Sequence, residues 1–101
     1  MDAETLYAYT DEQALSDGEL IEVTPPSARL KWVVTPTVHA TLSMAAVAEI
    51  YNELVIAIRK AGDWEKVEYP FVAKMNGKKL WAFIEPDHIG LTFKLIYPSE
   101  Y

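Results

Sequence analysis

The chain has 101 residues, of which 50% are hydrophobic and 12% aromatic, and it carries nine basic and 15 acidic side chains for a net charge of −6. This length and composition suit one domain with a single core, so residues 1–101 are expected to fold as one unit. The lack of cysteine in the sequence excludes disulfides, a thiolate metal site and a cysteine nucleophile. The acidic balance also argues against direct binding of nucleic acid.

The chain starts MDAE, without the basic region and apolar stretch of a secretory signal. The most apolar later segment is interrupted by Glu49, Asn52 and Glu53, which a membrane-spanning helix would not carry. We therefore expect a cytoplasmic protein that does not span a membrane.

Charge is distributed unevenly along the chain. Residues 1–28 hold seven acidic side chains and no basic one, whereas the remaining 73 residues hold eight acids and nine bases. An acidic N-terminal segment therefore precedes a nearly neutral body.

A short helix is predicted at about residues 11–17, because Thr10 and Gln13 have the spacing of a capping box and Gly18 can end a helix. Asp11 and Glu12 then lie in its first turn, where the helix dipole favours negative charge. The other five acids of this segment have no such role in local structure, so we take them as the candidate partner-binding residues. They are Asp2, Glu4, Asp17, Glu19 and Glu22.

The middle of the chain predicts two short strands, near residues 20–23 and 30–34, and then helix. Thr35-Pro36 is typical of a helix start, and Ser43 could open the main helix or continue an earlier one. That helix, at about 43–61, is predicted by a periodic apolar stripe and by the stop signal Gly62. The stripe comprises Met44, Val47, Ala48, Tyr51, Leu54, Val55 and Ile58.

From Val67 onward, apolar residues alternate with a period of two, and Asn76-Gly77 is a type I′ hairpin signal. A further turn before Leu91 leads into a last strand, so the C-terminal third is predicted to be a three-stranded antiparallel meander. The expected fold class is α+β: a short N-terminal helix and strand, then one long amphipathic helix packed on an antiparallel sheet that ends in this meander.

The sequence offers one weak enzyme constellation. Glu85, Asp87 and His88 place two carboxylates and an imidazole in one connection, which could bind a metal or move a proton. Turns are rich in such residues without being catalytic, and the isolated glycines form no phosphate-binding motif. We therefore expect no enzyme, no cofactor and no metal site.

Lys74, Lys78 and Lys79 surround the hairpin turn, with Trp81 nearby. Charge combined with an aromatic ring could bind single-stranded nucleic acid. Lysines also protect an exposed sheet edge from aggregation, and the acidic total favours this second interpretation.

Several stretches carry a family resemblance: YTDEQALSDGELIEV at residues 9–23, VT at 34–35, KLWA at 79–82, and LT through PSEY between 91 and 101. In these stretches the chain resembles an uncharacterised family of bacterial, plasmid and phage proteins, domain-of-unknown-function family 6573. Asp11 departs from the family pattern, which often has a basic residue there, and the span between 24 and 34 is short. The resemblance implies no activity or catalytic residue, but it implies genes on mobile elements.

Together these observations favour a small non-enzymatic binding protein. In a mobile-element context, its partner would be a host protein or another mobile-element protein, and an acidic surface could occupy the basic nucleic-acid channel of a defence nuclease. Such a protein would be an anti-CRISPR or anti-restriction inhibitor. The alternatives are a regulatory protein, monomeric or homodimeric through a sheet edge or helix, and the small enzyme described above.

Overall fold

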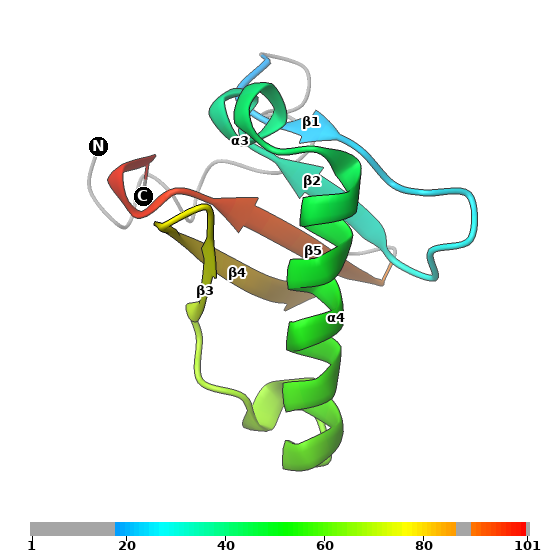
Figure 1. Cartoon of the computed structure of the whole chain (residues 1–101). Helices are drawn as coiled ribbons and strands as arrows, with labels where there is room; N and C mark the ends of the chain where they lie inside the picture. The colour runs from blue at the N-terminus through cyan, green and yellow to red at the C-terminus, as the bar shows by residue number, and fades with distance from the viewer. Residues whose placement is uncertain (1–17, 87–89, 101) are drawn as a thin grey trace.

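The computed structural model describes residues 18–86 and 90–100, which form a five-stranded sheet with two α-helices on one of its faces (Figure 1). In chain order the elements are β1 (Ile21–Glu22), β2 (Lys31–Val34), α3 (Pro36–Thr41), α4 (Met44–Ala61), the 3-10 helix η1 (Trp64–Lys66), β3 (Phe71–Met75), β4 (Lys78–Pro86), β5 (Leu91–Ile96) and the 3-10 helix η2 (Pro98–Glu100). The α+β prediction is confirmed. The predicted helix at 11–17 lies outside the described residues.

Side-chain caps separate α3 from α4. The Thr35 hydroxyl accepts a hydrogen bond from the Val38 N–H at 3.4 Å, and the Ser43 hydroxyl accepts one from the Ala46 N–H at 3.2 Å. Ser43 therefore opens the long helix and does not continue an earlier one. Gly62 ends α4 in the left-handed conformation, with φ of 95°, and its N–H donates to the Ile58 carbonyl.

The buried stripe of α4 differs in part from the predicted one. Val47, Ile50 and Leu54 are the buried residues of this helix, and Ile50 was not in the predicted stripe. Met44, in the first turn, is 45% exposed, so the contact with the sheet begins one turn later, at Val47.

The predicted hairpin and meander are confirmed. Asn76 and Gly77 both have positive φ, at 54° and 78°, as the two central residues of a type I′ turn require. Strands β3, β4 and β5 pair antiparallel, in the order of the chain.

The sheet is mixed, whereas the sequence predicts an antiparallel one. The strand order is β1-β2-β5-β4-β3, and β2 pairs with β5 in parallel, with Trp32 opposite Phe93. The alternation of side chains within a strand does not identify the neighbouring strand. A parallel pair needs a long connection, which α3, α4 and the β3-β4 hairpin provide between β2 and β5. Trp32, Val33 and Val34 are all buried, as is usual for strands of parallel pairing that are covered on both faces.

The two faces of the sheet have different side chains. The helix face packs against α3 and α4 and includes Trp32, Val34, Ala73, Leu80, Ala82, Ile84, Phe93 and Leu95. By alternation, the second face carries Glu22, Lys31, Val33, Val72, Lys74, Lys79, Trp81, Phe83, Glu85, Thr92, Lys94 and Ile96. The main core therefore lies between α4 and the helix face.

No helix among the described residues combines the length and apolar composition that crossing a bilayer requires.

Candidate functional site

Two of the five candidate partner-binding acids lie among the described residues. Glu19 and Glu22 are both exposed, beside and within β1, the outermost strand on one side of the sheet. The structure thus brings them to one edge, which we call the acidic edge. Asp2, Glu4 and Asp17 lie outside the described residues.

Glu22 has a local role that charge counting did not indicate. Its carboxylate accepts a hydrogen bond from the Thr24 hydroxyl at 2.9 Å, and the Thr24 oxygen in turn accepts one from the Trp32 backbone N–H at 2.9 Å. The prediction that Glu22 lacks any local structural role is therefore wrong, because its carboxylate orients the threonine that links β1 to β2. Glu22 as a whole is nevertheless exposed.

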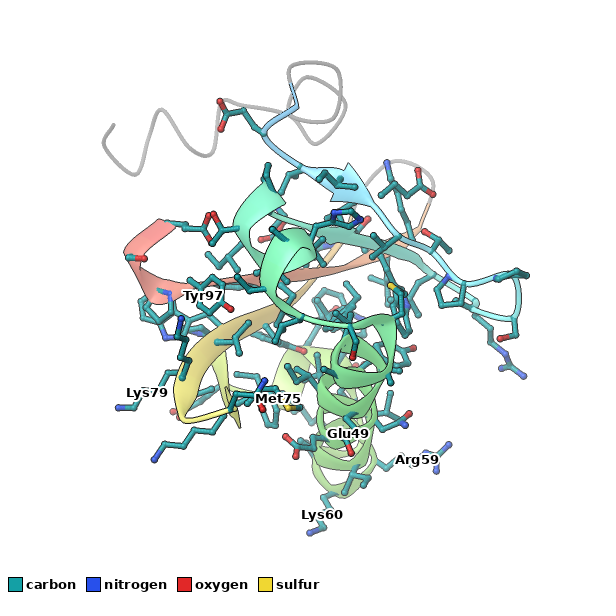
Figure 2. All side chains as sticks on the ribbon, turned by 45° about the horizontal axis from the view of Figure 1, so that its top comes forward. Glu49, Arg59, Lys60, Met75, Lys79 and Tyr97 are labelled. Carbon is teal, nitrogen blue, oxygen red and sulfur yellow. The ribbon has the colours of Figure 1, made fainter. Side chains whose placement is uncertain are left out.

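The long helix carries a second set of exposed charges. Glu49 and Glu53 lie four residues apart on α4, and Arg59 and Lys60 follow in its last turn. Figure 2 shows Arg59 and Lys60 projecting outward at the far end of this helix. The basic pair complements the helix dipole, which gives it a structural explanation.

The proposed enzyme constellation is only partly described. Glu85 accepts an ion-paired hydrogen bond from the Lys94 ammonium at 3.0 Å across β4 and β5, and its side chain is 42% exposed. Asp87 and His88 lie outside the described residues. Within residues 18–86 and 90–100, no group of three His, Asp or Glu side chains is placed to bind a metal ion.

The lysines of the hairpin lie at the opposite edge of the sheet from the acidic edge. Lys74 is on β3, which is the outermost strand on that side, and it stands directly opposite Lys79 of β4. Figure 2 shows Lys79 pointing away from the ribbon. The Lys78 ammonium lies 6.0 Å from the centre of the Tyr97 ring. Their placement fits the expected protection of a sheet edge.

Three aromatic rings between β2, β5 and α4 were not singled out as a cluster from the sequence. The Trp32 ring centre lies 4.6 Å from that of Tyr51 and 5.3 Å from that of Phe93. Burial raises the pKa of the Tyr51 hydroxyl, and the nearby Arg29 lowers it in part. Trp32 is only 4% exposed, and its ring N–H has no hydrogen-bond partner among the described residues. This cluster is core, so its tryptophan offers no surface to a partner.

Polar contacts tie the end of the described chain to α3. The Glu100 carboxylate accepts hydrogen bonds from the Thr35 hydroxyl at 2.8 Å and from the Tyr97 N–H at 3.0 Å. The hydroxyls of Thr41 and Tyr97 lie 2.6 Å apart. Glu100 thus has structural partners, and it is not a candidate for binding another protein.

Comparison of the chain with models of known protein families, with curated proteins and with solved structures finds no match. The mobile-element context therefore stays an expectation from the resemblance, and the functional argument depends on the geometry of the chain itself.

Proposed function

We propose that this protein acts without catalysis, by binding a basic surface of another protein through its acidic edge. The single observation that supports this is the exposure of Glu19 beside the outermost strand β1 and of Glu22 within it, shortly after a stretch of 17 residues with five further acids and no base. Two exposed carboxylates beside that stretch would give a basic partner a concentrated target.

The chemistry of the acidic edge indicates the kind of partner. Several neighbouring carboxylates can form ion pairs with lysine and arginine side chains that otherwise bind phosphate. Together with the mobile-element context that the resemblance implies, this favours a host defence nuclease of the restriction or CRISPR type. Asp2, Glu4 and Asp17 would extend the same contact.

The experiment compares two pairs of neutralised acids on the full chain. Glu19→Gln with Glu22→Gln removes the acidic edge, and Glu49→Gln with Glu53→Gln removes two exposed charges from α4. Glutamine keeps an oxygen that can accept from Thr24, so the local hydrogen bond of Glu22 is retained in the variant. Both variants change the net charge by the same amount.

The measured quantities are phage plating or plasmid uptake in cells with a defence nuclease, and then the association rate with the purified nuclease at several salt concentrations. We expect the edge variant to lose protection and to associate more slowly with a weaker salt dependence, while the α4 variant behaves as the original chain. Equal behaviour of the two variants would mean that the acidic edge only aids solubility.

A regulatory homodimer is the alternative that a specific observation favours. Among the strands of residues 18–86 and 90–100, β3 is the outermost on its side of the sheet, and its Val72 is 52% exposed. Pairing of β3 with a second copy would extend the sheet, although Lys74 opposes this by its charge. Light scattering at high protein concentration distinguishes the two ideas, because a strictly monomeric chain rules out the dimer.

A further inference from the structure

The outer edge of β3 has two residues whose backbone groups point away from the sheet. Met75 stands opposite Lys78 across the two-residue turn, which makes them a hydrogen-bonded pair, and such pairs alternate with non-bonded ones along an antiparallel ladder. Val72 and Lys74 therefore direct their N–H and C=O groups outward. Within the described part of the chain, β3 is the outermost strand on this side, and no backbone group outside the hairpin bonds to either residue (Figure 1). This edge can therefore accept a further strand.

The side chains along this edge offer apolar contacts on both faces of the sheet. Val72 lies on the second face and is 52% exposed. On the helix face, the buried Ala73 lies between Phe71 and Met75, which are both half-buried. An added strand would place one apolar side chain beside Val72 and another beside Ala73.

The charge of this edge is positive. Lys74 and Lys79 are both exposed and stand directly opposite each other on the second face, an arrangement that is unfavourable unless negative charge is near. In the described part of the chain, the ion pair of this face joins Lys94 to Glu85, so neither Lys74 nor Lys79 has a carboxylate partner there. Lysines at an edge discourage neutral and basic strands, but they attract an acidic one.

A second copy of β3 is a poor occupant of this edge. When β3 pairs antiparallel with the same strand of another molecule, Lys74 stands opposite Lys74 or Val72 of the copy, or opposite Pro70. The first two arrangements bring the lysines of both molecules together on one face. The third meets a proline, which has no N–H to donate. An acidic strand meets neither obstacle.

We propose that the outer edge of β3 binds an extended acidic segment of another protein as an additional strand. A carboxylate of this segment lies next to Lys74 and Lys79, and its apolar side chains lie next to Val72 and Ala73. Backbone hydrogen bonds to Val72 and Lys74 supply affinity, and the side-chain contacts supply specificity. The inference goes beyond the proposed function, because this edge is on the opposite side of the sheet from the acidic edge and takes a partner of opposite charge.

The test uses the full chain and two synthetic peptides. The first is acetyl-Thr-Glu-Val-Val-Val-Glu-Thr-amide, whose symmetric sequence places a carboxylate near Lys74 in either strand direction, and the second has lysine in place of both glutamates. Amide hydrogen exchange is followed by nuclear magnetic resonance. We expect the acidic peptide to slow exchange several-fold at Val72 and Lys74, but not at Ala73, whose N–H already points to β4. The lysine peptide should bind at least about fivefold more weakly.

Two variants test the charge and the backbone separately. Lys74→Glu should reverse the preference between the peptides, whereas the same charge change at the exposed Lys60 of α4 should leave it. Val72→Pro removes an outward N–H without removing a bond to β4, so it should weaken binding of the acidic peptide. Its melting temperature shows whether this variant still folds, and Lys74→Glu keeps the test decisive if it does not.

Equal binding of the two peptides, or unchanged exchange at Val72 and Lys74, would overturn the proposal. So would a folded Val72→Pro chain that binds the acidic peptide as well as the original does. Slow exchange at these two amides without peptide, increasing with protein concentration, would assign the edge to a second copy and would also overturn it. None of these measurements involves Glu19 or Glu22, so failure here is distinct from failure of the proposed function.

Discussion

The helix face and the second face of the sheet are buried by different means. On the helix face, Leu54 of α4 packs with Phe93 of β5 in one apolar cluster, and all its buried members are hydrophobic. On the second face, Val33 and Thr92 are just as inaccessible, yet they are surrounded by lysines and partly buried rings. Alternation along a strand therefore identifies which side chains share a face of the sheet, but not whether that face is covered.

The largest expected effect comes from the helix face. Phe93→Ala removes a fully buried ring that contacts Trp32 and Tyr51, so the free energy of unfolding should fall by about 3 to 5 kcal/mol. Urea denaturation measures this loss. A loss below about 1 kcal/mol would show that this cluster is not the centre of the core.

A smaller effect tests the second face directly. Val33→Ala should cost about 2 kcal/mol, because it removes buried methyl groups and leaves a cavity. The matched control is Val72→Ala on the same face, where the side chain is half exposed and the cost should stay within about 0.5 kcal/mol. If both substitutions cost the same small amount, Val33 is not covered in solution.

The ion pair on the second face should contribute less. Glu85→Gln removes the charge that meets Lys94, and since the Glu85 side chain is 42% exposed, we expect a loss of only about 0.2 to 1 kcal/mol that shrinks at high salt. Thermal denaturation at low and high salt measures it. A substitution that also abolished the biological effect without changing stability would revive the enzyme alternative.

The smallest effect concerns pH and the helix face. Burial raises the pKa of Tyr51 above 10.0, so its neutral form is favoured in the folded state. Its contribution to stability is complete below pH 10 and is lost as the pH rises through the raised pKa. Tyr51→Phe should therefore make stability fall less steeply above pH 10, as measured by urea denaturation at several alkaline pH values.

Tyr69 provides the contrast for this measurement. Burial and the charge of Asp63 also raise its pKa, but its hydroxyl donates to the Trp64 carbonyl at 2.9 Å. Tyr69→Phe should therefore lower stability at neutral pH as well, by about 1 kcal/mol. An unchanged alkaline slope in both variants would show that neither hydroxyl is protected from water.

Local signals were sufficient for most elements of the fold. The Asn76-Gly77 turn, the caps at Thr35 and Ser43 and the stop at Gly62 all function as their residue types predict, because each depends on nearby backbone geometry. The parallel pairing of β2 with β5 was not predictable in this way. It joins strands far apart in the chain, and tertiary packing alone selects it.

The candidate site shows the same limit. Glu19 is exposed, and its role as a partner-binding residue stays a prediction. The hydrogen bond from Thr24 to Glu22 could not be foreseen, because it depends on how the turn between β1 and β2 folds back. Pairing of Glu85 with Lys94 likewise depends on strand register, which the sequence of either strand alone does not contain.

The central position of β5 has a consequence for how the protein is made. Leu91–Ile96 lies between β2 and β4, although it is the last strand of the sheet to leave the ribosome. Until then, the β1-β2 pair and the β3-β4 hairpin are two separate pieces, each with an open edge of unpaired backbone groups. A chain halted before residue 91 would carry both edges, so translation stalling should produce aggregation-prone fragments and not a partly working protein.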